Sequence, residues 1–289
     1  MSMTDTVPTK YTLYTGCMIP VTSPNYEVSA RKVCDFFHIE LELLNAPCCG
    51  NPLKPVNLQK ATAMSLYVLG LASEKGLPLM TLCSACTSSL LEAQKKVDIN
   101  KSMLDQFNFD AQKIKNIKIK HFINILHEDI GVKTIKNTIK TPLPMKTAVH
   151  YGCHFHRPSS LYKKDPEYPT SLDELTEACG AHSVPYKSKS MCCGSPLIGI
   201  DSDLSLRMTA KKLTEIKEKA DSLIITCPGC GFMFDGKQKS AGSLVDQSLD
   251  IPVLYYSQVL GLALGMPPGD LGFQINRVRV NSLLEKVLP

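Results

Sequence analysis

Short apolar runs alternate with longer amphipathic stretches along this 289-residue chain. Four of the short runs favour β-structure, and each ends just before a cysteine: residues 11–15, 78–82, 148–151 and 223–226. Between them apolar residues recur at helical spacing, which predicts helices over residues 27–37, 58–73, 172–178 and 204–219. Asp203 is the predicted N-terminal cap of the last of these helices.

Each half of the chain continues in the same way. An alternating segment at residues 116–120 leads into a helix predicted over 121–130, and residues 251–256 lead into a helix predicted over 257–265. Strands and helices that alternate at these lengths predict βαβ units, and therefore an α/β fold with mostly parallel sheets. Open sheets of this kind bind ligands at the carboxyl ends of their strands. The cysteines that follow the strands are expected to converge at that edge.

Ten of the twelve cysteines form one pattern that occurs twice. Each copy has a single cysteine, an adjacent pair within a CCG motif, and a CxxC motif that begins 34 residues after the pair. The flanking sequence repeats as well, since APCCGNPL matches SMCCGSPL. The first copy is Cys17, Cys48, Cys49, Cys83 and Cys86, and the second is Cys153, Cys192, Cys193, Cys227 and Cys230.

A repeat of this length indicates a duplicated domain rather than a solenoid. The boundary is predicted in the proline-containing stretch at residues 141–146. This gives two pseudo-symmetric domains, residues 1–145 and 146–289, each a small, mostly parallel sheet with flanking helices. Cys34 and Cys179 lie outside the repeat and are expected to be buried packing residues.

The composition and the motifs that are missing argue against several classes of function. With 44% apolar and 20% charged residues, the chain can form an ordinary globular core. A net charge of +5 without a concentrated basic face argues against nucleic-acid binding. No apolar run suits a membrane span and no leader pattern begins the chain, so a cytoplasmic location is expected. Since no phosphate-binding glycine loop occurs, neither nucleotide nor flavin is expected on this chain.

In a reducing compartment, twelve cysteines favour metal or redox chemistry over disulfides. Zinc takes four ligands around one ion. The adjacent Cys48 and Cys49 do not easily place both sulfurs on one small ion, because consecutive side chains diverge, whereas a multi-iron core accepts both. Four cysteines hold an ordinary four-iron cubane, so five favour an enlarged or opened iron–sulfur cluster in each half. Zinc in one half, or reduced structural and redox-active cysteine pairs, are the alternatives.

The twice-repeated C…CCG…CxxC arrangement resembles the CCG-domain family. Within that family the segments YGCHFHRPSS, HFINILHEDIG and IPVLYYSQVLGLALGM are similar to the B subunits of archaeal heterodisulfide reductases, over essentially the whole chain. The resemblance implies a noncubane [4Fe-4S] cluster at each cysteine set. It also implies the methanogenic reduction of the mixed disulfide of coenzyme M and coenzyme B to two thiols. The implied partners are the small ferredoxin-like iron–sulfur protein of such reductases, their C subunit, and either a flavin-containing protein, their A subunit, or a membrane cytochrome.

The duplication suggests a mechanism. Disulfide reduction takes two electrons, and an iron–sulfur cluster usually passes one, so the disulfide is expected between the two clusters, each of which takes one sulfur and gives one electron. His154, directly after Cys153, is the candidate proton donor, unless it only hydrogen-bonds a cluster sulfur or the backbone; His156 is a weaker candidate. The candidates for binding anionic groups of the substrate are Arg157, Lys187 and Lys189.

Two other functions fit the same residues. CCG domains also resemble iron–sulfur subunits that pass electrons between a flavin dehydrogenase and a quinone or another acceptor. A zinc-stapled interaction module would instead hold about one zinc ion per half and catalyse nothing. An assay with the mixed disulfide separates the reductase from the electron-transfer subunit, and the iron content excludes or supports the zinc module.

Overall fold

The computed structural model describes residues 9–162 and 168–288. The expectation that the chain has no leader depends partly on its first residues, which lie outside the described residues. The described part contains two four-stranded sheets, and every strand pair in them is parallel. The first has the order β2-β1-β3-β4, with β1 (Lys10–Tyr14), β2 (Glu40–Leu43), β3 (Leu79–Thr81) and β4 (Ile119–His121). The second has the equivalent order β6-β5-β7-β8, with β5 (Lys146–His150), β6 (His182–Ser183), β7 (Ser222–Ile225) and β8 (Val253–Tyr255). The predicted α/β class with two related parallel sheets is confirmed.

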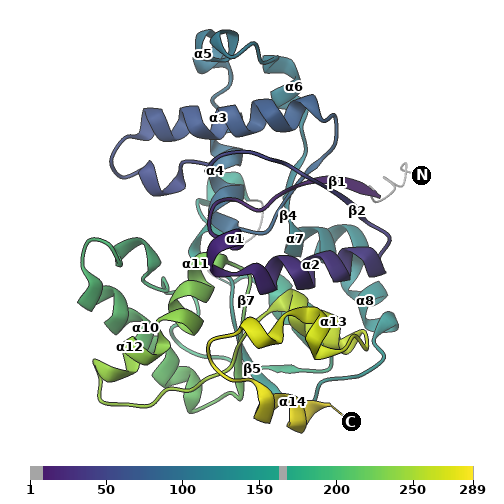
Figure 1. The fold of residues 1–289 in the computed structure, drawn as a ribbon, viewed down its shortest axis with the longest axis vertical. Helices are drawn as coiled ribbons and strands as arrows, with labels where there is room; N and C mark the ends of the chain where they lie inside the picture. The colour runs from purple at the N-terminus through teal and green to yellow at the C-terminus, as the bar shows by residue number, and fades with distance from the viewer. Residues whose placement is uncertain (1–8, 163–167, 289) are drawn as a thin grey trace.

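Helices cover both sheets (Figure 1). Those of the first half are α1 (Ile19–Thr22), α2 (Pro24–Phe36), α3 (Leu58–Glu74), α4 (Ser84–Gln94), α5 (Lys101–Gln106), α6 (Ala111–Asn116), α7 (Phe122–Asn124) and α8 (Val132–Thr138). Those of the second half are α9 (Ser171–Ala178), α10 (Ser202–Lys217), α11 (Pro228–Gly231), α12 (Gln238–Ser243), α13 (Tyr256–Ala263) and α14 (Asn281–Val287). A π-helical segment, Ile125–Gly131, joins α7 to α8.

The repeat extends to the caps of the long helices. Asn57 caps α3, and its side-chain oxygen accepts a hydrogen bond from the backbone N–H of Lys60 (2.9 Å). At the equivalent position Asp201 caps α10 and accepts from the N–H of Leu204 (2.9 Å). The prediction of Asp203 as this cap is wrong, because Asp203 already lies within the first turn of α10, whereas Asp201 has the extended backbone of a capping residue.

Helices of the two halves pack against each other. Helix α2 of the first half lies along α13 of the second (Figure 1). Helix α9 of the second half packs against α8 and the π-helical segment of the first. Ser29 and Ser257 share a buried hydrogen bond of 2.7 Å between α2 and α13. A single hydrophobic core runs through both halves. The division into domains at residues 145 and 146 therefore stays a prediction.

The two cysteines outside the repeat are packing residues, as predicted. Cys34 in α2 and Cys179 after α9 are both buried. Burial raises the pKa of each thiol to about 12, so both stay protonated and are poor ligands or nucleophiles. As for membranes, none of the helices described is both long and apolar enough to cross one.

Candidate metal centre

Each five-cysteine set lies at the carboxyl ends of three neighbouring strands, in the segments that follow them; the last cysteine of each set is within the next helix, Cys86 in α4 and Cys230 in α11. In the first half Cys17 follows β1, the pair Cys48–Cys49 follows β2, and Cys83 follows β3. In the second half the same positions follow β5, β6 and β7. This edge is where open α/β sheets bind ligands. The sheet topology therefore brings the cysteine-bearing segments together at one edge, as the sequence predicted.

The sulfurs of the first set lie together. The Sγ atoms of Cys17 and Cys48 are 3.6 Å apart, and those of Cys49 and Cys86 are 3.4 Å apart. Hydrogen bonds also link Cys48 to Cys49 and Cys83 to Cys86. The twelve cysteines all lie in the described part of the chain, and each is a free thiol.

The second set repeats these contacts. Cys153 interacts with Cys192, Cys193 with Cys230, and Cys227 with Cys230. The two sets also meet, because Cys83 in the first set and Cys227 in the second are close enough to shift each other's pKa, and a Cβ on Gly152 would lie 3.3 Å from Oγ of Ser84, next to Cys83, and 3.4 Å from Cβ of Cys227. The two groups of sulfurs are therefore neighbours at the junction of the halves.

Steric constraints require a glycine at the third position of each CCG motif. Gly50 and Gly194 have positive φ angles of 83° and 96°, a conformation that L side chains rarely adopt. A Cβ on Gly50 would lie 2.7 Å from the carbonyl oxygen of Ala61 in α3, and one on Gly194 would lie 2.5 Å from that of Ser205 in α10. The backbone N–H of each glycine donates to the sulfur of the first cysteine of the pair, at 3.4 Å in both halves. The missing side chain thus lets the loop pack closely against the helix, and the backbone N–H of the glycine stabilises the thiolate of the first cysteine.

The thiols of each set share their protons unequally. Hydrogen bonds from Cys17 and Cys49 hold the pKa of Cys48 far below its ordinary value, and those from Cys153 and Cys193 do the same for Cys192. Hydrogen bonding to Cys48 and burial raise the pKa of Cys17. Hydrogen bonding also lowers the pKa of Cys227 in the second set. Since the thiolate is the form that binds metals, the first set has one sulfur and the second has two that favour ligation at neutral pH.

The residues present fit an iron–sulfur cluster at each set. The donors are all thiols, five per set, and a single cysteine, a CC pair and a CxxC motif contribute them from separate loops. Gly16 leaves room beside the first set, because a Cβ there would lie 2.9 Å from the Sγ of Cys86. Within the described residues no three His, Cys, Asp or Glu side chains are placed to hold a single metal ion. The arrangement suits a multi-metal core shared by sulfur pairs.

The predicted histidines flank the second set. His154 lies in the short turn Cys153–Phe155, is partly exposed, and has a pKa lowered by burial. Its backbone oxygen accepts a hydrogen bond from the hydroxyl of Tyr162 at 2.9 Å. His156 is 4% exposed and packs edge-on to Tyr151, so it is less accessible to a substrate than His154. Arg157 is partly exposed and directly follows His156.

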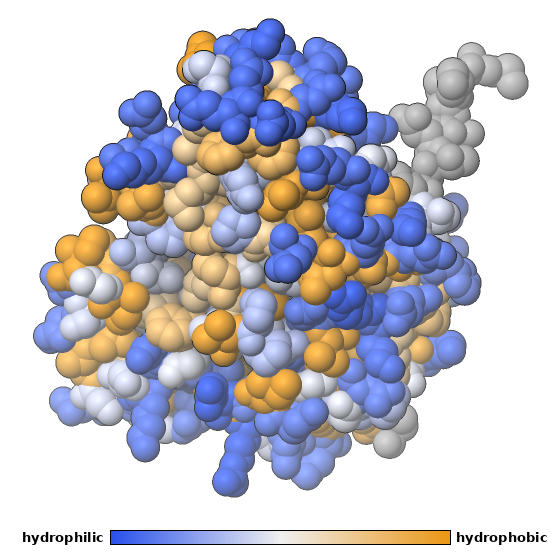
Figure 2. All heavy atoms as spheres, turned by 45° about the horizontal axis from the view of Figure 1, so that its top comes forward, coloured by the Kyte–Doolittle hydropathy of each residue, from blue (hydrophilic) through white to orange (hydrophobic). Residues whose placement is uncertain are grey.

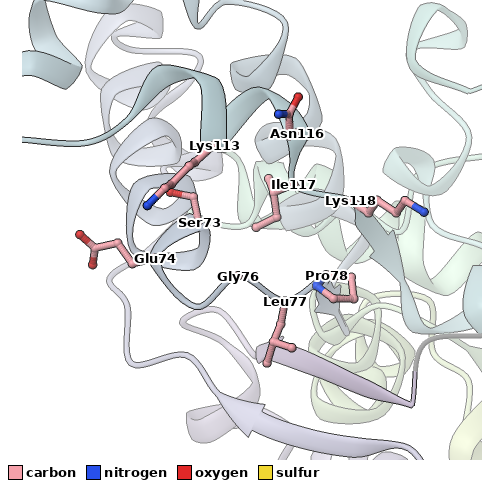
Figure 3. Close-up of a pocket in the computed structure, with 9 residues that line it drawn as sticks. All are labelled: Ser73, Glu74, Gly76, Leu77, Pro78, Lys113, Asn116, Ile117 and Lys118. Carbon is pink, nitrogen blue, oxygen red and sulfur yellow. The ribbon is translucent and has the colours of Figure 1, made fainter.

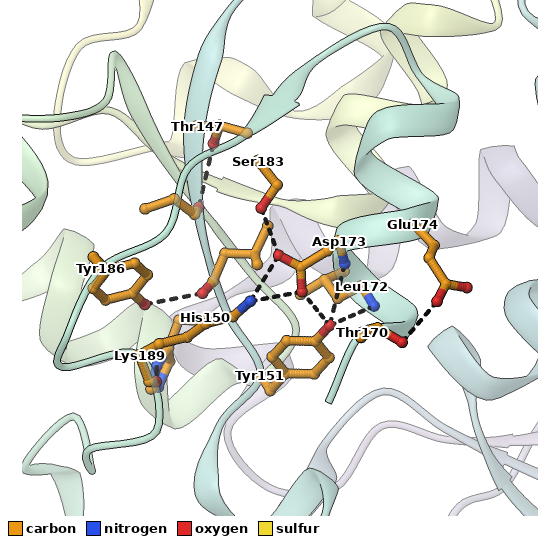
Figure 4. Close-up of polar contacts among 12 residues, drawn as sticks. Thr147, His150, Tyr151, Thr170, Leu172, Asp173, Glu174, Ser183, Tyr186 and Lys189 are labelled. Carbon is orange, nitrogen blue, oxygen red and sulfur yellow. Dashed lines mark hydrogen bonds and ion pairs between the residues drawn. The ribbon is translucent and has the colours of Figure 1, made fainter. Parts of the chain in front are cut away.

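The two predicted lysines differ in their surroundings. Lys187 is exposed, and its backbone N–H donates a hydrogen bond to the carboxylate of Glu215. The ammonium of Lys189 contacts both carboxylate oxygens of Asp173 at 2.7 Å. Asp173 also accepts from the hydroxyls of Tyr151 and Ser183, and Figure 4 shows these side chains converging on it. The charge of Lys189 is thus already paired, and its role toward a substrate stays a prediction.

The sequence patterns did not point to several polar residues behind the CC pairs. Ser65 in α3 donates to the carbonyl of Cys49 at 2.5 Å, and the equivalent Thr209 in α10 donates to the carbonyl of Cys193 at 2.8 Å. Lys212 in α10 is buried and donates to the carbonyl of Met191, next to Cys192. Aligning the two halves on their cysteines pairs Ser65 with Thr209, a signal that could have found them.

The pocket drawn in Figure 3 lies away from the cysteines. Its lining includes Pro78 and Lys118, which directly precede β3 and β4, so it sits at the opposite edge of the sheet from the cysteines (Figure 3). On the face in Figure 2 a strip of hydrophobic residues runs between hydrophilic margins. The loops after the two CCG motifs each carry an equivalent exposed apolar residue, Val56 at 82% and Ile200 at 80% exposure.

Two segments of the chain, residues 11–91 and 147–235, match the family model described as a cysteine-rich CCG domain. Together they cover more than half of the chain, so this protein belongs to the CCG cysteine-rich domain family. Each matched segment contains all five cysteines of one set. The family that the cysteine pattern indicated is confirmed.

Among curated proteins, the chain is similar to B subunits of heterodisulfide reductases. It is 36% identical to the B subunit of the "Ferredoxin:CoB-CoM heterodisulfide reductase" of Methanosarcina mazei, over 96% of this chain and 97% of that one. It is 33% identical to the B subunit of the "Ferredoxin/F(420)H(2)-dependent CoB-CoM heterodisulfide reductase" of Methanosarcina acetivorans, with the same coverage. The expected likeness to these oxidoreductase subunits is confirmed.

Two further comparisons bear on function and fold. The chain is 28% identical to the "8-methylmenaquinol:fumarate reductase membrane anchor subunit" of Wolinella succinogenes, over 95% of this chain and 99% of that one. Among solved structures, a hypothetical protein from Helicobacter pylori superposes with a TM-score of 0.76 at 18% identity, covering 94% of this chain and 52% of that one. This last likeness shows the fold alone.

Proposed function

We propose that this chain is the disulfide-reducing subunit of a heterodisulfide reductase, with one noncubane [4Fe-4S] cluster at each cysteine set. The observation that carries the proposal is the contact between Cys83 and Cys227, which brings two sets of five thiols side by side. The substrate is the mixed disulfide of coenzyme M and coenzyme B, which the names of the Methanosarcina relatives contain. The first set belongs to a domain at residues 1–145 and the second to a domain at residues 146–289.

The duplication suits the stoichiometry of the reaction. Reduction breaks one S–S bond, takes up two electrons and two protons, and releases two thiols. When bound, the two iron–sulfur clusters supply the electrons, one each. The chain holds ten cysteine sulfurs at one junction, so that both sulfurs of a nearly symmetric disulfide can reach redox groups together. The exposed Cys17 and the partly exposed Cys153 mark the side from which the substrate enters.

His154 is the proposed proton donor. It adjoins the cysteine at the entrance of the second set and is more accessible than His156. Free imidazole has a pKa of ~6.5, which suits a group that passes protons, and burial lowers the pKa of His154 from that value. Arg157 and Lys187 are the proposed contacts for anionic groups of the substrate. Replacement of His154 by Gln should slow turnover while the iron content stays unchanged.

Electrons reach this chain from other subunits. The proposed donor is a small ferredoxin-like iron–sulfur subunit, supplied in turn by a flavin-containing subunit or a membrane cytochrome. The named relatives are themselves subunits of larger reductases, which supports a complex.

The test is an anaerobic assay of this chain together with the small iron–sulfur partner, with reduced viologen as electron donor and the mixed disulfide as acceptor. Cys193→Ala should abolish turnover and retain the spectroscopic signal of the first cluster. Cys34→Ala is the matched control, since Cys34 is a buried cysteine outside both sets. Full activity of the Cys193→Ala chain would contradict the two-cluster reaction.

A second candidate is an electron-transfer subunit that cleaves no disulfide. The similarity to the Wolinella fumarate reductase subunit over nearly the full length of both chains favours it. Such a chain would hold iron and exchange electrons with a quinone or another acceptor, yet leave the mixed disulfide intact in the same assay.

A further inference from the structure

The two CC pairs are held by different chemistry, although their surroundings otherwise repeat. In the first half the carbonyl before the pair, that of Pro47, accepts a hydrogen bond from the hydroxyl of Tyr14 at 2.7 Å. In the second half the carbonyl before the pair, that of Met191, accepts from the ammonium of Lys212 at 2.7 Å. A neutral donor therefore holds one loop and a cationic donor holds the other.

Alignment of the halves on their cysteines makes this difference explicit. The position of Lys212 in α10 corresponds to Val68 in α3, and both side chains are buried, at 1% and 0% exposure. The position of Tyr14 at the end of β1 corresponds to His150 at the end of β5. The second half thus has a buried lysine and histidine where the first has a valine and a tyrosine.

Among the residues that the structure describes, the hydrogen-bond partners of the Lys212 ammonium are all neutral. Its ammonium donates to the carbonyls of Met191 and Lys189, at 2.7 and 3.2 Å, and to Nδ1 of His150 at 3.2 Å. The imidazole accepts this bond, and burial lowers its pKa well below the ordinary value, so it is neutral. Burying a cation costs several kcal/mol unless negative charge lies nearby. Burial lowers the pKa of Lys212 to about 8, and the thiols of Cys230, Cys193 and Cys192, followed by Glu215, oppose this shift when they are ionised.

A fixed positive charge next to a redox group favours the form that carries the extra electron. Net charge and hydrogen bonding around the sulfurs are among the factors that set the potential of an iron–sulfur cluster. In a buried site this effect is screened less than at the surface. Since Val68 puts no charge behind the first set, the effect acts on the second set alone.

We propose that Lys212 is a positioning residue that raises the reduction potential of the group bound by Cys153, Cys192, Cys193, Cys227 and Cys230, and thereby makes the two clusters of this chain inequivalent. The inference rests on the proposed function, because it requires a cluster at the second set. His150 assists by orienting the ammonium toward the loop before the CC pair.

The test separates the charge of Lys212 from its hydrogen bonds. Lys212→Gln keeps a donor for the carbonyls and removes the charge, Lys212→Arg keeps the charge, and Val68→Met is the matched substitution at the equivalent buried position of α3. Each chain is prepared anaerobically, its iron is determined, and its two clusters are titrated with a reductant while electron paramagnetic resonance is recorded. The Cys193→Ala chain, which retains only the first cluster, assigns the steps.

The expected result is a lower potential for the second cluster in Lys212→Gln. Its reduction equilibrium should fall at least tenfold, equivalent to 59 mV for one electron. The first cluster should not move, and Lys212→Arg and Val68→Met should leave both potentials close to those of the unaltered chain. No shift, an equal shift of both clusters, or the same shift in Lys212→Arg would overturn the inference.

Loss of the second cluster from Lys212→Gln would also overturn it, because the lysine would then have a structural role only. An unaltered chain that binds no iron would instead contradict the proposed function, so the two failures are distinguishable. The iron determination on the unaltered chain therefore precedes the titration.

Discussion

The ring of Tyr26 in α2 stacks on the ring of Tyr255 at the end of β8, with centroids 4.2 Å apart and an interplanar angle of 8°. The hydroxyl of Tyr26 donates to the carbonyl of Thr226, the residue before Cys227. The hydroxyl of Tyr255 donates to Ser23 at the start of α2. This pair of rings therefore joins the first half to the strand and loop that present the second cysteine set.

Tyr26→Leu should weaken both halves together. It removes the stacking and leaves the buried carbonyl of Thr226 without this donor, so we expect the free energy of unfolding to fall by about 2–4 kcal/mol. Denaturant unfolding measured by circular dichroism checks this. Tyr67→Leu is the control, because Tyr67 contacts only Phe107 and Phe109 among the aromatic rings described, all within the first half. Unchanged stability of Tyr26→Leu would contradict the coupling.

Gly16→Ala should remove the first cluster selectively. The added Cβ would lie 2.9 Å from the Sγ of Cys86, and the φ angle of 69° adds about 1–2 kcal/mol of strain. The iron content should drop to about half that of the unaltered chain. Gly76→Ala carries the same strain at a φ of 66°, but its Cβ would meet nothing within 4 Å, so its iron content should stay whole. Equal iron in the two variants would argue against a cluster beside Gly16.

Thr209→Val and Ser65→Ala should each loosen one CC pair. Each substitution removes a hydroxyl that donates to the carbonyl of the second cysteine of the pair, Cys193 or Cys49. A buried carbonyl left without this donor costs about 1–3 kcal/mol. On heating, Thr209→Val should release iron from the second set first and Ser65→Ala from the first set first. Thr62→Val, a change at a partly exposed position of the same helix as Ser65, should leave the release temperature as it was.

Acid should destabilise the fold through His121. This buried imidazole caps α7 with Nδ1, and burial lowers its pKa to about 4. The unfolded chain takes up the proton near pH 6.5, so stability is full above that pH and declines as the pH falls from 6.5 to 4. The contribution lost is about 3 kcal/mol.

His121→Asn tests this pH dependence, because asparagine also caps helices but does not titrate. Unfolding free energies measured between pH 4 and pH 7 should vary less in this variant than in the unaltered chain. His182→Asn, at an exposed histidine of β6, is the control. An identical pH dependence in the His121→Asn variant and the unaltered chain would show that His121 is not the responsible group.

The sequence predicted the parts of the fold in which pattern and packing agree. Strands β1, β3, β5 and β7 are short apolar runs, and the amphipathic α3 and α10 follow helical spacing, so all six were found to within a few residues. Strand β2 was missed because it is half-exposed, and β6 because it has only two residues. Helix α4 was missed because its buried face carries serines and a threonine, which give no apolar period.

The same limit applies to the site. Ten cysteines could be identified because the duplication preserved their spacing and the topology brings their loops to one edge. Lys212 could not, because a lysine in an amphipathic helix is normally solvated, and its partner carbonyl lies 21 residues away in a loop without regular structure. The pairing of Lys189 with Asp173 was equally hidden, since it depends on how α9 packs beside that loop.

The central claim is that each five-thiol set holds iron, and elemental analysis of the anaerobically purified chain tests it most directly. The account predicts roughly eight iron atoms per chain with matching sulfide and negligible zinc, and about half that iron in Cys193→Ala. One or two zinc ions per chain, or a colourless chain whose ten thiols all react with a thiol reagent, would contradict it.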